Sequence, residues 1–335
     1  MGLLVLERPL IVDNERVLSA FAMNPVRVGV IGIGNMGFAM MARLLSQAWP
    51  VFAHDIEPLH IKKAVALGAN ECASPAEIAL QCRISFIVVV DAKQAHSVLS
   101  GPMGLLSQAR PGDLVFLCPT LGPLDVEKAS DAAKAKGVFL IDSPMSGGPV
   151  RAREGQMSLM LAGDSVQLTK NEALLNAITA HRFVIGQKPG DAAKTKLANN
   201  LLAAVNLAGA SEVLAMAQAW GLSAETTLQV MQSSSGQSWI GQDRMSRALQ
   251  NDFEPRAHTS LLAKDTRLAL EACEYLNVSV PALGKLASQQ FTKACELGFA
   301  NQDDASLFLM AGGQPIEPGM GSMDLGHCRF FGCNG

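Results

Sequence analysis

The stretch that decides the fold runs from residue 26 to residue 55. It begins Val26-Arg27-Val28-Gly29-Val30-Ile31-Gly32-Ile33-Gly34-Asn35-Met36-Gly37 and ends Val51-Phe52-Ala53-His54-Asp55. The first six residues are rich in β-branched side chains, which predicts a buried parallel strand, and the glycines follow without a gap. The acid that ends the second strand lies 18 residues after Gly37. This order of strand, glycine turn, helix, strand and acid predicts dinucleotide binding, whereas the glycines alone would indicate only a structural turn.

Each glycine of this turn has its own expected role. Gly32 permits the tight turn, Gly34 lets the backbone approach a pyrophosphate at the helix N-terminus, and Gly37 lets the helix pack closely on the strand. The residues between them are expected to contact the cofactor as well: Ile33, Asn35 and Met36. Asp55 is placed to bind a ribose 2′-hydroxyl and to repel a 2′-phosphate, so NAD is predicted as the cofactor in preference to NADP.

Composition excludes several classes of protein. The chain of 335 residues has 27 Lys and Arg against 30 Asp and Glu, a net charge of -3, and no basic block, which argues against a nucleic-acid partner. Its seven scattered cysteines form no Cys-x-x-Cys pair and are interpreted as small buried hydrophobes in a reducing compartment, the cytoplasm, with no metal site. No apolar run approaches the ~20 residues that span a bilayer, so no membrane partner is expected.

The chain changes character once along its length. Short apolar strands, expected at 84–90, 114–118, 138–142 and 157–162, alternate with helices up to about residue 185, and from Asp191 Ala, Leu, Gln and Met dominate. We therefore predict an α/β N-terminal Rossmann domain with a mainly parallel, doubly wound sheet, followed by an all-α domain. The predicted boundaries are a disordered extension at 1–24, the NAD-binding domain at 25–188, the helical substrate and dimerisation domain at 189–312, and a disordered tail at 313–335.

The first helix of the second domain carries the expected chemistry. Lys196, Asn199 and Asn200 stand at i, i+3 and i+4 and share one face, beside an apolar stripe that includes Leu197 and Leu201. A lysine that borders such a face is desolvated, which lowers its pKa and suits it to proton transfer near neutral pH. The alternative is a lysine that extends to the surface along its apolar stem.

Other mechanisms are disfavoured by the residues present. The only tyrosine is Tyr275, and Ser279 occupies the position where a Tyr-x-x-x-Lys pair would need its lysine. A zinc enzyme would need clustered cysteine and histidine ligands, and none cluster in the sequence. Of six histidines, His258 is the reserve acid or base, because it lies beside Arg256 and shortly before Lys264.

A second constellation follows the strand expected at 138–142. Ser146-Gly147-Gly148 comes after Pro144, and its glycines free the backbone to point successive N–H groups at one spot. Such a nest, with the Ser146 hydroxyl, would bind a carboxylate. The alternative is an ordinary loop that leads to the next strand.

These motifs together resemble the β-hydroxyacid dehydrogenases, which include 3-hydroxyisobutyrate dehydrogenase and tartronate semialdehyde reductase. The matching order is GxGxMG, Asp-x-Pro-x-Ser-Gly-Gly, Lys-x-x-Asn-Asn and then Lys264-Asp265, over about residues 26–311. The resemblance implies that Lys196 transfers the proton, that Ser146, Gly147, Gly148 and Asn200 hold the substrate, and that the helical domains form dimers or tetramers. It also implies cofactor contacts at Val89, Val90, Gln94, Thr120 and Lys264.

The chain departs from the family pattern at several positions, which leave the reaction type unchanged and the substrate open. They are Pro119, Asp91 and Ala257, and the additional cations Arg151 and Arg256. The stretch from Ser238 to Arg256 bears a faint resemblance to the L-threonate dehydrogenases of the family.

The predicted function is an NAD-dependent oxidoreductase that interconverts a small 3-hydroxy acid and its semialdehyde, with Lys196 as general acid and base. The alternatives are an imine reductase of the same architecture, which usually lacks the lysine, and a non-catalytic nucleotide-binding regulator. A 6-phosphogluconate dehydrogenase would need a much larger helical domain.

Overall fold

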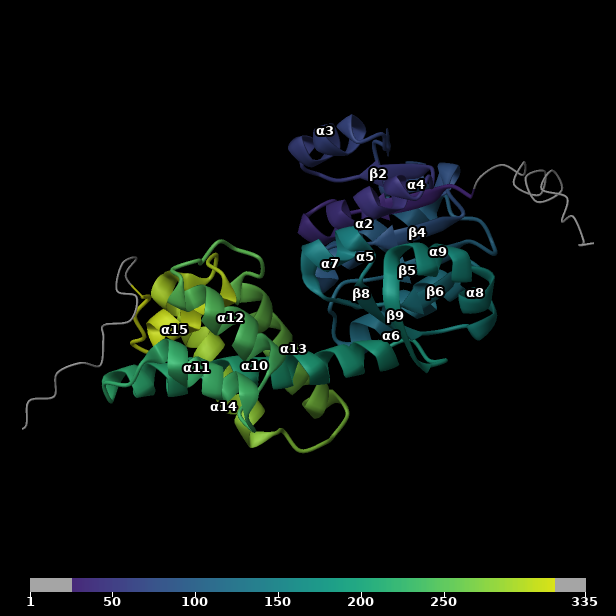
Figure 1. Cartoon of the computed structure of the whole chain (residues 1–335). Coiled ribbons are helices and arrows are strands. Elements are labelled where there is room, and N and C mark those ends of the chain that lie inside the picture. Colours follow the sequence, from purple (N-terminus) through teal and green to yellow (C-terminus); the bar gives the residue numbers. More distant parts are fainter. Residues whose placement is uncertain (1–25, 317–335) are drawn as a thin grey trace, which may run out of the picture. The chain divides into compact units, whose positions relative to one another are not determined.

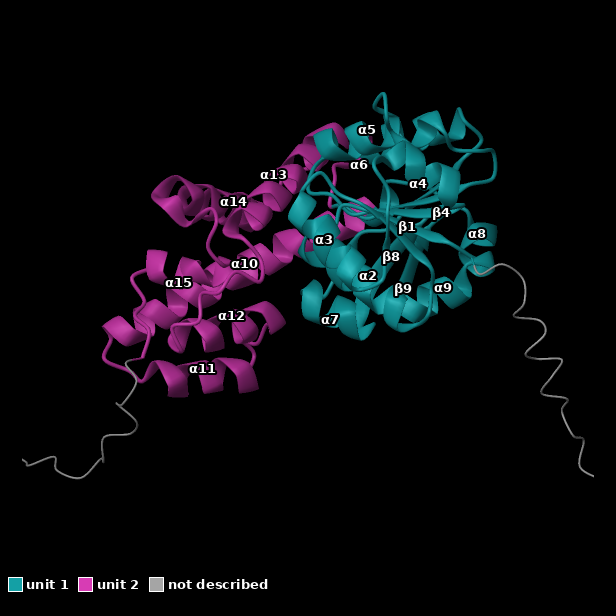
Figure 2. Cartoon of the chain, turned by 90° about the horizontal axis from the view of Figure 1, so that it is seen from above, with its two compact units in different colours: residues 1–119, 125–192 teal, residues 120–124, 193–335 magenta. Residues whose placement is uncertain are grey.

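The computed structural model describes residues 26–316, which form two compact units. Of the described residues, unit 1 holds 26–119 and 125–192, and unit 2 holds 120–124 and 193–316 (Figure 2). The extension predicted at 1–24 and the predicted tail beyond residue 316 lie outside the described residues.

Unit 1 is built on a nine-stranded sheet in the order β3-β2-β1-β4-β5-β6-β8-β7, with β9 paired to β8 (Figure 1). Strands β1 to β6 are parallel throughout, and β8 runs antiparallel to β6 and β7. The order 3-2-1-4-5-6 is that of a doubly wound dinucleotide fold, so the predicted fold class is confirmed. The strands are β1 Val28–Ile31, β2 Val51–His54, β3 Asn70–Glu71, β4 Ile84–Ile87, β5 Leu114–Leu117, β6 Phe139–Asp142, β7 Met145–Ser146, β8 Met157–Ala162 and β9 Thr179–Gly186.

Helices cover this sheet in two groups. Helix α2 packs with α7 and α9, whereas α4 and α5 both pack with the short helix η1. The apolar core that the sheet shares with α2, α7 and α9 includes Phe86 of β4, which stacks on Phe116 of β5 with ring centroids 4.7 Å apart. The helices are α2 Asn35–Ser46, α3 Pro58–Ala66, α4 Pro75–Gln81, α5 Ala92–Ser100, η1 Leu105–Ser107, α6 Pro123–Lys134, α7 Gly148–Glu154, α8 Ser165–Lys170 and α9 Glu172–Ile178.

Unit 2 is all helical in its described residues, as predicted. Its core gathers around two fully buried aromatic side chains, Phe291 and Phe308, with Leu207 and Leu214 of the long helix α10. The helices are α10 Asp191–Ala219, α11 Ala224–Ser233, α12 Trp239–Leu249, α13 Thr259–Tyr275, α14 Ala282–Ala294, the π-helical turn η2 Cys295–Phe299, η3 Asp304–Ser306 and α15 Leu307–Met310.

Helix α10 corrects one sequence expectation. By length and composition alone it could cross a membrane, with a mean hydropathy of 1.4 over 18 residues. Asn199 and Asn200 interrupt the apolar run, so no unbroken stretch of this length stands out in the sequence. Half of the apolar window is buried within the structure. Helix α10 contributes to the core of unit 2, in which its Leu207 and Leu214 are fully buried.

Residues 313–316 also differ from the expectation of a tail that is disordered from residue 313. The Gln314 N–H donates to Gln218 Oε1 at 2.9 Å, and the Ile316 N–H donates to the Leu249 carbonyl at 2.8 Å. These backbone bonds tie the segment to the helices of unit 2. The many glycines after Gly312 predicted an unstructured tail, but the partners of these amides lie far away in the sequence.

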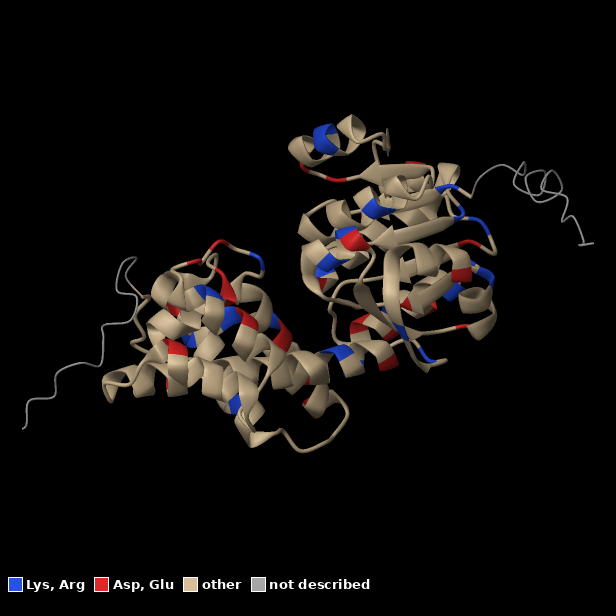
Figure 3. Cartoon of the chain, viewed as in Figure 1, with Lys and Arg blue, Asp and Glu red and all other residues tan. Residues whose placement is uncertain are grey.

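Positions of basic and acidic residues are interspersed along the described backbone of both units (Figure 3). No stripe of one sign stands out on either unit in this view, which agrees with the small net charge.

Candidate active site

The glycine turn between β1 and α2 has the geometry expected of a pyrophosphate cradle. Gly32 has a φ of +89°, and a Cβ added at Gly37 would collide with the Gly32 carbonyl oxygen. A Cβ at Gly34, by contrast, would meet no atom within 4 Å, so the backbone there is open to a ligand. Gly34 precedes α2, whose first turn contains no acid and therefore keeps the positive end of the helix dipole available for an anion.

Asp55 follows β2 and is tied to this glycine turn. Its Oδ2 accepts the Ile33 N–H at 2.5 Å, and its Oδ1 accepts the Glu57 N–H at 2.8 Å. Ile33 is buried and Met36 is half-buried, whereas Asn35 is exposed. The predicted ribose-binding acid thus lies beside the predicted pyrophosphate turn.

Val89, Val90 and Gln94 lie at the carboxyl end of β4, next to β1 in the sheet. The Val90 N–H donates to Gln94 Oε1 at 2.9 Å, and the Gln94 N–H donates to Asp91 Oδ1 at 2.8 Å. Strands β1 and β4 flank the point where the strand order reverses, which is where doubly wound sheets bind their ligands. The Gln94 amide holds the turn at Val90, and Asp91 caps helix α5.

The predicted nest lies in the turn between β7 and α7. Ser146 ends β7, and Gly147 and Gly148 have φ values of +123° and +74°, which glycine adopts without strain. A Cβ added at Gly147 would lie 3.1 Å from Arg151 Cδ, whereas one at Gly148 would meet open space. The backbone therefore takes the conformations that the two glycines were expected to provide.

Lys196 is a buried amine in unit 2. The residue is only 7% exposed, and the next residues on its stripe, Leu197 and Leu201, pack against Ala269 and Ala272 of α13. Burial lowers the pKa of Lys196 to about 8; the Asp265 charge opposes this shift and the Lys264 charge adds to it. A lysine with this pKa is substantially neutral near pH 8 and can accept a proton.

Asp265 organises the polar groups around this lysine. It is 6% exposed, its Oδ2 accepts a 2.6 Å hydrogen bond from Asn200 Nδ2, and its Oδ1 lies 3.1 Å from Lys264 Nζ. Asn199 Nδ2 in turn donates to Asn200 Oδ1 at 3.1 Å. Sequence reasoning missed Asp265 as a site residue, although it stood in the Lys-Asp motif.

Lys264 connects this cluster to the segment Thr120–Leu124, which belongs to unit 2. Its Nζ donates to the Thr120 carbonyl at 2.9 Å. The structure therefore brings together Thr120, Lys264, Asn199, Asn200 and Lys196, which were all named from the sequence. The glycine turn, Asp55, Val89, Val90, Gln94 and Ser146 to Gly148 belong to unit 1.

The reserve histidine lies in a different environment from that of Lys196. His258 precedes α13, and its Nδ1 lies 2.9 Å from the Asn301 carbonyl. Arg256 pairs with Asp252 at 2.7 Å, and its N–H donates to Asp303. Both residues thus contact the loop 301–304, and neither joins the Asp265 cluster in the contacts described.

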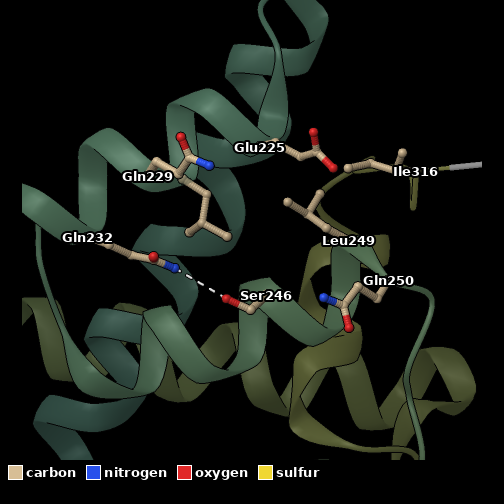
Figure 4. A pocket seen from close by; sticks show the side chains of 8 residues that line it. Glu225, Gln229, Gln232, Ser246, Leu249, Gln250 and Ile316 are labelled. Carbon is tan, nitrogen blue, oxygen red and sulfur yellow. Dashed lines mark hydrogen bonds between the residues drawn. The ribbon is translucent and has the colours of Figure 1, made fainter. Parts of the chain in front are cut away.

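A pocket in the helical unit lies apart from the predicted site residues. A pocket of about 500 Å³ lies between α11, α12 and Ile316, where Gln232 donates to Ser246 Oγ at 3.2 Å (Figure 4). Glu225, Gln229 and Gln250 also line it, and it contains none of the predicted site residues. Within residues 26–316, no group of three His, Cys, Asp or Glu side chains is arranged to hold a metal ion.

Comparison with known proteins agrees with both halves of this arrangement. Residues 27–186 match the NAD-binding domain of 6-phosphogluconate dehydrogenase, and residues 190–310 match the NAD-binding family of NADP-dependent 3-hydroxyisobutyrate dehydrogenase. L-Threonate dehydrogenase of Cupriavidus necator is 31% identical over 280 residues, which cover 84% of this chain and 94% of that protein. The mitochondrial 3-hydroxyisobutyrate dehydrogenase of Mus musculus is 27% identical over 288 residues, which cover 84% of this chain and 85% of that protein.

Solved structures show the same likeness. The crystal structure of 3-hydroxyisobutyrate dehydrogenase from Salmonella typhimurium superposes with a TM-score of 0.78 at 28% identity, covering 85% of this chain and 99% of that one. An imine reductase from Pseudomonas sp. reaches a TM-score of 0.58 at 20% identity, which shows the shared fold alone.

The chain belongs to the β-hydroxyacid dehydrogenase family. It is an NAD(P)-dependent hydroxyacid dehydrogenase, as the order of its motifs predicted.

Proposed function

We propose that Lys196 is the general acid and base of an NAD-dependent dehydrogenase that interconverts a small 3-hydroxy acid and its semialdehyde. The observation that carries the proposal is the buried Lys196 amine, whose pKa is lowered to about 8 by burial. A positioned base with a pKa near the working pH combines the correct protonation state with enough basicity for proton transfer.

Each neighbouring residue has a role in this scheme. Neutral Lys196 takes the hydroxyl proton during oxidation and returns it during reduction, and NAD supplies the hydride acceptor when bound. Asn200 orients the substrate hydroxyl, because Asp265 fixes its amide through the 2.6 Å hydrogen bond. Lys264 and Thr120 serve the cofactor, together with the glycine turn, Val89, Val90 and Gln94.

Ser146, Gly147 and Gly148 bind the substrate carboxylate in this proposal, with Asn199 beside Asn200 as a further polar contact. Arg244 pairs with Asp243 and with Asp304, both at 2.5 Å, and Arg256 pairs with Asp252. Because both guanidinium groups are engaged within the protein, we favour a substrate with a single carboxylate over a dicarboxylate.

The substrate class follows from the relatives, whose names refer to L-threonate, 3-hydroxyisobutyrate and 2-(hydroxymethyl)glutarate. We propose that L-threonate and 3-hydroxyisobutyrate delimit the substrate class. The 31% identity to the Cupriavidus necator threonate enzyme, against 27% to the mouse 3-hydroxyisobutyrate enzyme, supports the acceptance of a polyhydroxy acid.

NADH formation, followed by its absorbance over a panel of these three acids, tests the proposal, with Lys196→Ala as the blank. Turnover of a hydroxy acid is expected in the wild type only. Reduction of a cyclic imine with none of the acids oxidised would favour the imine reductase alternative, and NAD binding without any turnover would favour the regulator.

We further propose a homodimer or homotetramer formed through the helical unit, located in the cytoplasm. Large apolar side chains are exposed on unit 2, among them Leu202, Trp220, Leu222, Leu283 and Leu286. Light scattering of the purified protein measures the assembly, and a monomer would contradict this part of the proposal.

A further inference from the structure

The Asp55 carboxylate is already largely used by the protein itself. It accepts the Ile33 N–H on Oδ2 and the Glu57 N–H on Oδ1, and its side chain is only 10% exposed. A carboxylate offers about four lone-pair positions. Backbone N–H groups occupy two of these positions. The Asp55 carboxylate therefore interacts less strongly with a ligand than a free aspartate would.

A third group lies against this carboxylate. His60 Nδ1, in the first turn of α3, lies 3.3 Å from Asp55 Oδ2, but it makes no well-directed hydrogen bond there. The histidine side chain is 38% exposed, considerably more than Asp55. The imidazole is therefore the more accessible partner of this pair.

The surroundings suit a ligand. Ile56, directly after Asp55, is 90% exposed, and Leu59 is also exposed on the first turn of α3. Two large apolar side chains exposed beside a buried acid offer an adenine ring the apolar surface that it prefers.

The charges near His60 come from α3 and from the elements packed against it, namely α2, β2 and β3. Among the described residues, Asp55 is the charged side chain recorded in an ion pair with the imidazole. The other charged or titratable groups on these elements are Glu57, Lys62 and Lys63 of α3 and its cap, Arg43 of α2, His54 of β2 and Glu71 of β3. Arg43 donates to the Ala177 carbonyl and His54 Nδ1 lies 2.9 Å from the Cys72 carbonyl.

We propose that His60 determines, together with Asp55, the choice between NAD and NADP. This rests on the proposed function only in that Asp55 faces the adenosine ribose. Neutral His60 leaves the Asp55 charge to repel a 2′-phosphate, so NAD is preferred. Protonated His60 cancels that charge and presents its exposed edge to the phosphate, so NADP is admitted.

Equilibrium binding tests this without requiring turnover. The dissociation constants of NAD and NADP are measured by calorimetry at about pH 6 and about pH 8, the range in which histidine ordinarily changes charge. The 2′-phosphate itself titrates near pH 6, so the preference of a His60→Ala variant supplies the baseline. His181→Ala is the matched control, because His181 is an exposed histidine on β9, at the opposite edge of the same sheet.

In the wild type and in His181→Ala, the preference for NAD over NADP should be about fivefold stronger at pH 8 than at pH 6, after the change seen in His60→Ala has been divided out. This is the size of effect expected of one partly exposed charge pair. His60→Arg, whose charge is permanent, should bind NADP better than wild type at pH 8. Equal pH dependence in wild type and His60→Ala, or no gain of NADP binding in His60→Arg, would overturn the inference. Lys196→Ala should bind both cofactors as the wild type does. The binding assay can therefore succeed or fail independently of the catalytic role proposed for Lys196.

Discussion

Asp265 and Lys264 are adjacent on α13, with Oδ1 and Nζ 3.1 Å apart, yet they act in opposite directions on the Lys196 amine. The Asp265 carboxylate raises the pKa of Lys196, and the Lys264 ammonium lowers it, while burial sets the overall decrease to about 8. One ion pair therefore adjusts the basicity of the residue proposed to transfer the proton.

Removing the charge of Asp265 and removing the charge of Lys264 should shift the pH profile of oxidation in opposite directions. Asp265→Asn removes the effect that raises the Lys196 pKa, so the rising limb of the kcat/KM profile for oxidation should move to lower pH. Lys264→Met should move the same limb to higher pH. If both variants shift the profile in the same direction, their charges do not act on the group that titrates. Lys285→Ala is the control, because Lys285 is an exposed lysine on α14.

Asp55 should also govern cofactor preference directly. Asp55→Ala removes both the ribose acceptor and the negative charge, so the preference for NAD over NADP should narrow by at least about tenfold, or about 1.4 kcal/mol. The ratio of kcat/KM values for the two cofactors measures this. A wild-type enzyme that uses both cofactors equally at pH 8 would contradict the assignment.

Gly147 should matter for substrate and not for cofactor. Gly147→Ala places a methyl group 3.1 Å from Arg151 Cδ in a backbone with a φ of +123°, so the nest should distort and KM for the hydroxy acid should rise strongly. NAD affinity should stay unchanged. Gly221→Ala, also at positive φ but with no atom within 4 Å, controls for backbone strain alone. Equal losses of substrate and NAD affinity would place this loop at the cofactor.

A buried ion pair should dominate the stability of the helical unit. Asp303 is fully buried and accepts from Arg247 Nη2 at 2.8 Å, so Asp303→Ala leaves the buried guanidinium with only its longer 3.4 Å contact to Asp243 and should cost about 3–5 kcal/mol of unfolding free energy. Asp252→Ala, which breaks the exposed pair with Arg256, should cost less than about 0.5 kcal/mol. Urea unfolding followed by circular dichroism compares the two, and equal costs would refute the difference.

The fold was predictable where strands are buried on both faces. Phe139–Asp142 and Met157–Ala162 are mostly apolar, with one polar residue each, and the structure has strands within or at the predicted limits. Strand β9 was not named, because seven of its eight residues are exposed or half-exposed and show no alternation. Strands β3 and β7, of two residues each, are too short to carry a pattern.

Local signals were also reliable. Ser74, followed three residues later by Glu77, forms a capping pattern in the sequence, and its hydroxyl accepts the Glu77 N–H at the start of α4, although Glu77 reaches back to the Ala73 N–H and not to that of Ser74. Gly137 ends its helix with a φ of +68°.

The site was predictable where one helix face defines it and not where distant residues meet. The burial of Lys196 followed from the apolar stripe of its own helix. The hydrogen bond between Asn200 and Asp265 joins residues 65 positions apart, and no periodicity shows such a contact. Lys194, two residues before Lys196, is half-buried.

The most direct measurement is the pH profile of oxidation in wild type and Lys196→Ala. In the wild type, kcat/KM should rise with pH and level off above about 8, because only the neutral amine accepts the proton. In Lys196→Ala, kcat should fall by ~10² to 10⁴, the usual contribution of a positioned proton-transfer group, and the limb near pH 8 should be lost while NAD still binds. Near-normal turnover in Lys196→Ala, together with collapse in His258→Ala, would contradict the assignment and move the acid and base role to His258.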